Sequence, residues 1–324
     1  MTSTSLPASL LTRWTNFWFR PVPPHSFALL RMLLGGVGLL SLAGLTPVEL
    51  YWPLDGMVPL AGKLGWRAAL EGAGLGGVAG WLAFGLLVLA FTAMTVGYRS
   101  NLAVLACFVG LVLQQYWNRL PLSSAHQLMQ NLIFCLVWAE TGRVWSVDSL
   151  RRSAAAEAEP DGDGVPVWPL WLMRFQIAVV YGTSGLWKFA YPTWRDGSAV
   201  YWSLNLNIFH RFPWPWPAAA DPVFSLLTWG TLAFELLFPV LVWFRRLRPA
   251  VLIGGIALHI GLGLTLELGP FSLVMIAGYL AFLDPDRSPA LMARWSEWFQ
   301  RRGLLVEARH EVAGTPSREV EEVR

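Results

Sequence analysis

Lys188 is the residue whose type and position best suit chemistry. It is one of two lysines among 24 basic residues, and it ends the apolar run 168–188, where Arg174 is the other charge. A run of this length can cross a bilayer, which would place Lys188 where hydrocarbon meets water. A lysine at that depth can extend its ammonium into the headgroups, or it can be partly desolvated and serve as a base.

Other polar residues also stand in or beside apolar runs, where an ionisable group costs several kcal/mol unless it is paired. In chain order they are Arg31, Gln114, Gln115, His126, Gln130, Asn131, Glu140, Arg174, Gln176, Lys188, Glu235, His259 and Glu267. They can carry function, or they can hydrogen-bond between helices and hold a bundle together. For Arg31, Arg174 and Glu235, single charges at an inner or middle depth, we favour the second interpretation.

The elements that must position these residues are membrane spans. The chain is 55% hydrophobic and 14% charged, whereas soluble domains carry about a quarter charged residues. Many of the 19 tryptophans lie at the edges of apolar runs, as in an aromatic belt. The composition therefore predicts an all-α, polytopic membrane helical bundle. About eight transmembrane helices are expected, at 27–45, 78–96, 102–118, 122–139, 168–187, 223–244, 251–268 and 270–283.

Basic residues set the expected orientation. With eight spans, 16 Lys and Arg residues fall inside and 6 outside, whereas a re-entrant hairpin in place of the last two spans gives 9 against 13. We expect an interfacial N-terminal segment at 1–26 and a transmembrane domain at 27–285 with a disordered cytoplasmic loop near 153–164. A cytoplasmic amphipathic or disordered tail follows at 286–324. The expected location is a bacterial inner membrane, with both termini cytoplasmic.

Depth selects four residues from the polar set. His126 begins the fourth span, Lys188 ends the fifth and Glu267 ends the seventh, all on the outer side. His259 lies two turns deeper than Glu267, because eight helical residues rise about 12 Å. We expect these four side chains to gather around one cavity that opens outward. Taken one at a time, these residues have simpler interpretations. Lys188 can be an ordinary interfacial lysine, and each histidine can cap a helix or pack in the interior.

Further candidate pocket residues lie close to these four. Gln130 is one turn below His126 on the same helix face. Trp187 and Trp194 flank Lys188 in sequence, and Glu267 completes the expected substrate pocket. The long outer segments 46–77 and 189–222 are the expected mouth.

Charge and motifs argue against nucleic-acid and metal sites. A net charge of +3 is too small to indicate nucleic-acid binding. The five histidines are dispersed and neither HExxH nor CxxC occurs, so we expect no metal site. Cys107 and Cys135 stand in apolar runs and are expected to pack there.

Three stretches resemble a known membrane family. They are HQLMQNLIFCLVWAETGRVWSVDSL (126–150), MRFQIAVVYGTSGLWKFAYPTWRDGSAVYW (173–202) and LHIGLGLTLELGPFSLVMIAGYLAFLDP (258–285). With PVPPHSFALLRMLLGGVGLL (21–40), they resemble the horizontally transferred transmembrane (HTTM) domain, over roughly residues 10–290. The GLWKF block and the WSVD tetrapeptide are its more specific parts. The family includes the vitamin K-dependent γ-carboxylase of animals.

The resemblance implies a chemistry and a cofactor. In the carboxylase, reduced vitamin K is deprotonated and reacts with oxygen, and the strong base so formed removes a γ-proton from glutamate before carbon dioxide adds. The family's lysine for quinol deprotonation corresponds to Lys188, and its functional histidine to His126. Another family histidine resembles His259. A reduced quinone of the vitamin K or menaquinol type is the implied cofactor, and membrane lipid and a secreted peptide or protein are the implied partners.

Three functions stay open at this point. One is a quinol-dependent, carboxylase-like enzyme of the carbon–carbon lyase type, with Lys188 as base and His126 and His259 as its partners. A second is a non-catalytic HTTM membrane protein that assists maturation or export of a secreted peptide. A third is a transporter, although no internal repeat or matched helix break supports it. Replacing Lys188 by alanine and by arginine separates the first two, because arginine keeps the charge but does not give up its proton.

Overall fold

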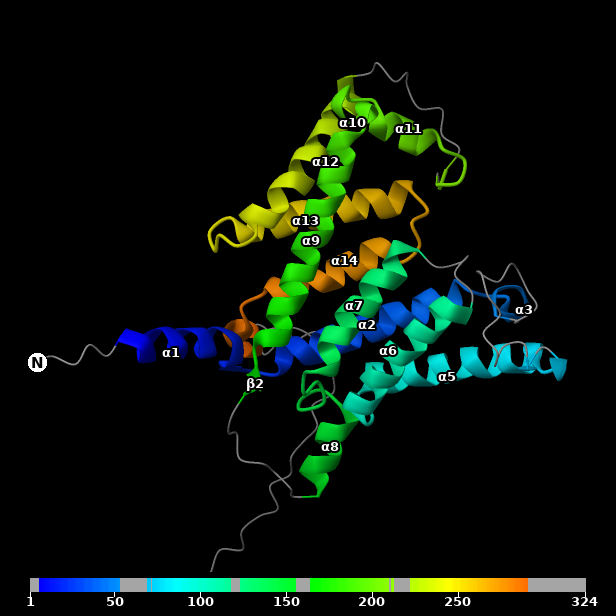
Figure 1. Ribbon diagram of the computed structural model, residues 1–324, viewed down its shortest axis with the longest axis vertical. Helices are drawn as coiled ribbons and strands as arrows, with labels where there is room; N and C mark the ends of the chain where they lie inside the picture. Colours follow the sequence, from blue (N-terminus) through cyan, green and yellow to red (C-terminus); the bar gives the residue numbers. More distant parts are fainter. Residues whose placement is uncertain are drawn as a thin grey trace, which may run out of the picture.

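The computed structural model describes residues 6–52, 69–70, 72–117, 123–155, 164–209, 211–212 and 222–290. In that part the regular secondary structure is helical apart from one strand pair, as the composition predicts (Figure 1). The elements are α1 (Leu6–Phe19), β1 (Pro21–Val22), α2 (His25–Ala43), α3 (Val48–Tyr51), α5 (Gly76–Val96), α6 (Ser100–Trp117), α7 (Ser124–Val137), α8 (Val147–Ala154), β2 (Val165–Pro166), α9 (Trp168–Ala190), α10 (Pro192–Arg195), α11 (Ala199–Asn205), α12 (Pro222–Leu241), α13 (Arg248–Thr265), α14 (Phe271–Tyr279), η1 (Leu280–Phe282) and η2 (Pro285–Arg287). Strands β1 and β2 pair antiparallel, with Pro21 opposite Pro166.

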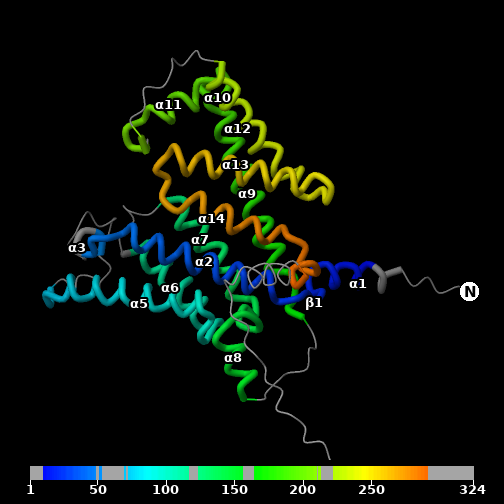
Figure 2. The backbone as a smooth tube through the Cα atoms, turned by 180° about the vertical axis from the view of Figure 1, so that it is seen from behind, coloured from blue at the N-terminus to red at the C-terminus, as the bar shows by residue number. Residues whose placement is uncertain are grey.

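Each of the eight expected spans contains a helix. Among the described residues, four helices, α2, α5, α12 and α13, are long and apolar enough to cross a membrane. Helix α6 and the α14–η1 segment are apolar but shorter. Figures 1 and 2 show that successive long helices reverse direction, so that α5 begins near the end of α2, α7 near the end of α6, α12 near the end of α9 and α14 near the end of α13. The chain is therefore an all-α membrane protein with four candidate spanning helices.

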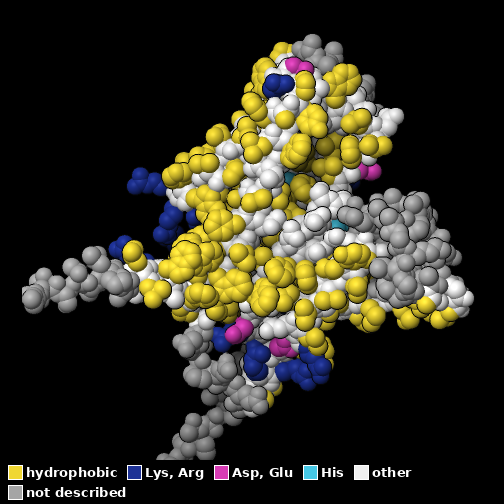
Figure 3. All heavy atoms as spheres, in the orientation of Figure 1, with side chains coloured by type: hydrophobic (Ala, Val, Ile, Leu, Met, Phe, Trp, Pro, Cys, Tyr) yellow, Lys and Arg dark blue, Asp and Glu magenta, His cyan; other side chains and the backbone are white. Residues whose placement is uncertain are grey.

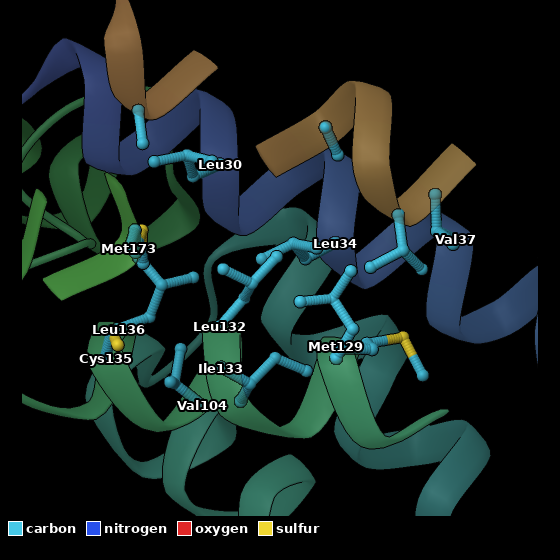
Figure 4. Close-up of a cluster of buried hydrophobic side chains, with 14 of the residues drawn as sticks. Leu30, Leu34, Val37, Val104, Met129, Leu132, Ile133, Cys135, Leu136 and Met173 are labelled. Carbon is cyan, nitrogen blue, oxygen red and sulfur yellow. The ribbon is translucent and has the colours of Figure 1, made fainter. Parts of the chain in front are cut away.

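The centre of the bundle is formed where α2, α7, α9 and α14 meet. Leu30 and Leu34 of α2, Leu132 and Leu136 of α7 and Met173 of α9 are fully buried and face one another (Figure 4). Lipid tails are as apolar as these side chains, so close packing rather than removal from water holds such helices together.

The outer surface is largely apolar, as expected of a membrane protein. Hydrophobic side chains cover most of the face shown in Figure 3. On α5, Leu82, Leu86 and Leu89 are exposed and recur at helical spacing. This face of α5 is therefore suited to contact hydrocarbon.

Arg31 is fully buried, and it joins three segments. Its guanidinium donates to the carbonyl oxygens of Thr95 at 2.9 Å, Trp145 at 2.6 Å and Thr141 at 3.2 Å, and also to that of Met94. The carbonyls of the last turn of α5 have no partner within their own helix, so a cation is favourable there. Arg31 thus joins helices, as its single charge suggests.

The WSVD tetrapeptide, 145–148, is a capping device. Asp148 accepts hydrogen bonds from the backbone N–H of Arg99 at 2.8 Å and of Ser100 at 2.7 Å, at the start of α6. The Ser146 hydroxyl accepts from the backbone N–H of Ser149 and caps α8. Burial alone would raise the pKa of Asp148, but these hydrogen bonds and nearby Arg152 outweigh it and hold the pKa below its usual value.

Helices α9 and α12 lie side by side and set the depth of the site (Figure 1). A Cβ on Gly185 would lie 3.0 Å from the backbone nitrogen of Leu236, and one on Gly182 would lie 3.4 Å from Pro239. These close approaches place the second half of α9 against the C-terminal half of α12. Helix α12 therefore extends beyond α9 at its N-terminal end, where α10 and α11 pack against it.

The regions flanking the expected transmembrane domain are partly described. Helix α1 lies within the expected N-terminal segment 1–26 and ends before Pro21. Helix α8 continues through Ala154, so the first residues of the expected loop at 153–164 are helical. Residues 156–163 and 291–324 lie outside the described residues.

Candidate functional site

A cavity of about 480 Å³ lies among α9, α12, α13 and the start of α14, beneath α10 and α11. Its walls are mainly apolar, and its polar lining residues come from four helices. They are Tyr181, Ser184, Lys188, Ser203, Thr231, Glu235, His259 and Thr265. A mostly apolar cavity of this size with a few converging polar groups is typical of a small-molecule site.

Lys188 forms an ion pair with Glu235 inside this cavity. The Lys188 side chain is 26% exposed and that of Glu235 is 7% exposed. The Lys188 ammonium also lies over the ring of Trp194, 4.8 Å from its centroid. The lysine therefore turns inward toward a carboxylate and does not extend its ammonium into the headgroups.

His259 is the second buried polar group of the cavity. Its Nε2 lies 2.8 Å from the Tyr181 hydroxyl, which in turn forms a hydrogen bond with the hydroxyl of Tyr279. All three side chains are buried, and the ring of Phe271 packs edge-on against the imidazole. The imidazole is thus fixed in position by a chain of two phenols.

Two buried polar atoms of the cavity lack a partner within the described part of the chain. They are Oε2 of Glu235 and Nδ1 of His259. Buried polar atoms nearly always form hydrogen bonds, and an unsatisfied one costs about 1–3 kcal/mol. Both residues line the cavity, so a ligand in it is the natural source of the missing hydrogen bonds.

His126 is placed elsewhere, as a cap of α7. Its Nδ1 accepts a hydrogen bond of 3.1 Å from the backbone N–H of Ser123, and its Nε2 lies 2.8 Å from the Ser41 hydroxyl of α2. The ring is buried, and His126 is not among the cavity's lining residues. The outer depth expected for both His126 and Lys188 does not bring them to the same cavity, because the His126 ring is held by Ser41 of α2 and by Ser123.

The expected pocket residues separate in the structure. Trp194 lines the cavity, whereas Gln130 accepts a hydrogen bond from Gln115 of α6. Trp187 is 69% exposed, because neighbouring helical residues point about 100° apart and Lys188 faces inward. Glu267 is exposed just after α13, and its backbone N–H donates to the carbonyl of Phe209 at 2.7 Å.

Glu235 and Tyr181 are cavity residues that the sequence did not single out as functional. Glu235 is the one acidic residue in the apolar helix α12, and the sequence interpretation made it a helix-joining charge. The sequence does contain a signal for Glu235. Lys188 and Glu235 carry opposite charges and stand in consecutive apolar runs, so they could be expected to pair. Tyr181 carries no such signal, because buried tyrosines are common in apolar runs.

Metal-ligating groups are scattered in the structure. Across the residues it describes, no three His, Cys, Asp or Glu side chains lie together in a way that could hold a metal ion. Cys107 and Cys135 are free and buried.

Comparison with known sequences identifies the family. The sequence model of the HTTM domain matches residues 19–287, which is most of the chain. The chain belongs to the HTTM domain family. The HTTM match includes the helices around the cavity, from Tyr181 of α9 to Met275 of α14.

One relative of this HTTM protein is itself uncharacterized. A stretch of 120 residues is 28% identical to the uncharacterized protein YitO of Bacillus subtilis (strain 168). The matched stretch covers 35% of this chain and 38% of that relative. No solved structure matches this HTTM chain.

Proposed function

We propose that this protein binds a reduced quinone of the vitamin K or menaquinol type in the α9–α12–α13 cavity and removes a ring-hydroxyl proton there. One observation carries the proposal: the Lys188–Glu235 ion pair and the unpartnered Nδ1 of His259 face the same apolar cavity. Family membership adds to this, because the HTTM domain resembles the vitamin K-dependent carboxylase.

The residues present fit such a ligand. The cavity volume of about 480 Å³ lies within the range of small-molecule pockets. Leu258, Leu262 and Phe271 offer an apolar surface for a fused ring. The two unpartnered atoms, on Glu235 and His259, offer hydrogen bonds to polar groups at the edges of that ring.

The ion pair changes the expected role of Lys188. An ammonium beside a carboxylate is charged, so Lys188 can accept a proton only after passing its own to Glu235. When bound, a reduced quinone supplies the hydroxyl whose proton is removed. Glu235 is then the final proton acceptor, either directly or through Nζ of Lys188, and the ammonium stabilises negative charge left in the cavity.

His259 positions the ligand in this proposal. If the Tyr279 hydroxyl donates to Tyr181 and Tyr181 donates to Nε2, the proton of His259 is on Nδ1, which then donates into the cavity. If the chain runs the other way, Nδ1 accepts instead. In both directions one hydrogen bond of His259 is left for a ligand.

The segment after α9 lines the cavity through Trp194, Ser203 and Phe209, and we propose that the mouth of the cavity lies there. The backbone N–H of Arg211 donates to the carbonyl of Thr265 at 3.1 Å, so the segment after α11 is fastened to the end of α13. We propose that this mouth faces outward from a bacterial inner membrane, with both termini cytoplasmic. A carboxylase-like reaction on a secreted peptide would use this opening.

The first test is quinone retention. Membranes containing the wild-type protein are solubilised, and co-purifying quinones are quantified by mass spectrometry for wild type, Glu235→Gln and Glu267→Gln. Glu267 is an exposed carboxylate near the same mouth and serves as the matched control. We expect wild type and Glu267→Gln to retain quinone and Glu235→Gln to lose about tenfold, the effect of one strong hydrogen bond. If wild type retains no quinone above background, the proposal is wrong.

The second test separates an enzyme from a non-catalytic partner in peptide maturation or export. Quinol-dependent oxygen uptake is measured for Lys188→Arg and Lys188→Ala, normalised to the protein present in the membrane. We expect both variants to be inactive, because arginine keeps the charge but does not release its proton. Wild-type turnover in Lys188→Arg would rule out proton transfer through Nζ and leave direct transfer to Glu235, whereas no quinol-dependent oxygen uptake by the wild type itself would favour the non-catalytic function.

A further inference from the structure

A second, smaller cavity lies at the opposite end of α13 from the proposed quinol site. Its volume is about 350 Å³, and it lies between the first turns of α2 and α13 and the η1–η2 segment. Leu29, Leu252, Leu280 and Phe282 make its walls apolar. Its rim is formed by Arg245, Arg248 and Arg287 together with Asp284.

A neighbouring shallow pocket is also lined by arginines. That pocket shares Arg245, Arg248 and Asp284 with the first and adds Arg20 and Arg174. Figure 3 shows basic side chains gathered at the left edge of the molecule, next to the hydrophobic surface. An apolar groove therefore ends in a cluster of guanidinium groups.

The acidic residues of the cluster do not balance its charge. Asp286 pairs with Arg20 at 2.9 Å, and Asp284 is shared between Arg245 at 3.3 Å and Arg287 at 3.7 Å. Five arginines thus face two carboxylates.

The other two arginines of the cluster bind only neutral groups. Among the described residues, Arg174 donates to the carbonyls of Ala281 and Leu283, and Arg248 donates to those of Val242, Trp243 and Phe282. The Arg245 and Arg287 side chains are 77% and 82% exposed, so they are free to turn toward a ligand.

We propose that this groove binds an anionic phospholipid, with an acyl chain along Leu29 and Leu252 and the headgroup phosphate against Arg245 and Arg287. Excess positive charge beside an apolar groove complements an amphipathic anion, and arginine forms paired hydrogen bonds with phosphate oxygens. Basic pockets between membrane helices bind acidic headgroups for the same reason. This site goes beyond the proposed quinol chemistry and does not depend on it.

The proposal is tested by lipid retention. The purified protein is exchanged into mixed micelles that contain equal amounts of phosphatidylglycerol and phosphatidylcholine, and bound lipids are counted by native mass spectrometry. We expect wild type to retain phosphatidylglycerol in preference to phosphatidylcholine. In the double variant Arg245→Gln/Arg287→Gln that preference should fall roughly thirtyfold, since each basic residue near an acidic headgroup contributes about 1 kcal/mol.

Controls separate the groove from general charge. Arg151→Gln/Arg195→Gln removes two exposed arginines outside the groove and should keep the wild-type preference. An equal loss in this control, or no preference in wild type, would overturn the proposal. Glycerol phosphate and inorganic phosphate, added separately at the lipid's concentration, should displace little lipid. Displacement by either would mean a site for a soluble anion and would also overturn the proposal.

Discussion

The Lys188 side chain turns inward because two groups attract its ammonium there. Glu235 supplies a carboxylate, and the face of Trp194 supplies a cation–π contact. Neither charge would be stable alone in an apolar cavity, because it would lack most of its solvation. In the proposed proton transfer, the two residues would therefore act as a single unit.

A double-mutant cycle tests this coupling. Lys188→Met leaves Glu235 unpaired and should lower the free energy of unfolding by about 3 kcal/mol, whereas Lys188→Met/Glu235→Leu should recover most of that loss. Unfolding is followed by helical circular dichroism as sodium dodecyl sulfate is added to detergent-solubilised protein. Additive effects of the two single substitutions would show that the ion pair contributes little.

The WSVD tetrapeptide, one of the more specific parts of the HTTM resemblance, has a structural role in joining helices. Trp145 offers its carbonyl to Arg31, Ser146 caps α8 and Asp148 caps α6. Three of its four residues thus fix the junction of α2, α6 and α8. None of the four lines the cavity.

Asp148 gives this junction a pH dependence of known sign. Its pKa is below the ordinary 3.8, so the stability it contributes is complete above that value and is lost as pH falls through the lower, folded-state pKa. Asp148→Ala should lower the free energy of unfolding by about 1–2 kcal/mol at pH 7. Thermal unfolding in detergent should show that this difference narrows below pH 4. A difference that is constant down to pH 3 would contradict the capping role.

The packing of α9 on α12 depends on Gly185. A Cβ there would lie 3.0 Å from Leu236 and 3.2 Å from the carbonyl carbon of Glu235, so the helices must separate. Gly185→Ala should cost about 1–3 kcal/mol and reduce quinone retention, because it moves Glu235.

Gly230 of the same helix α12 is the matched control for Gly185→Ala. A Cβ at Gly230 meets no atom within 4 Å. Gly230→Ala should be neutral or stabilise the helix by up to about 1 kcal/mol. Thermal unfolding and quinone content are measured on both variants, and equal effects would show that close helix contact is not the cause.

For the whole molecule, the helices could be predicted from the sequence but the partnerships between them could not. Apolar runs predict a helix at each of the eight positions, because hydropathy reports directly on local sequence. The run that ends at Lys188 also brings that lysine to the wall of the cavity. Which carboxylate it meets depends on how far α12 slides along α9, and that is set by contacts at Gly182 and Gly185.

His126 shows the limit of reasoning from depth. Depth along the membrane normal is one coordinate, and it does not specify position around the bundle. His126 and Lys188 were both expected at the outer ends of spans, yet one ring caps α7 against α2 and the other side chain faces α12. Position around the bundle requires the helix contacts, which no single residue reports.

The alternation of helix ends makes the topology testable. With the expected eight crossings, Ser153 of α8 and Asn205 of α11 would lie on opposite sides of the membrane, and both residues are exposed. The native cysteines Cys107 and Cys135 are buried and should not react with a polar reagent. In intact cells, a membrane-impermeant maleimide should label Asn205→Cys but label Ser153→Cys only after the membrane is opened. Labelling of Ser153→Cys alone would reverse the orientation, and labelling of both in intact cells would mean that the chain between them does not cross the membrane, because α9 joins the two segments.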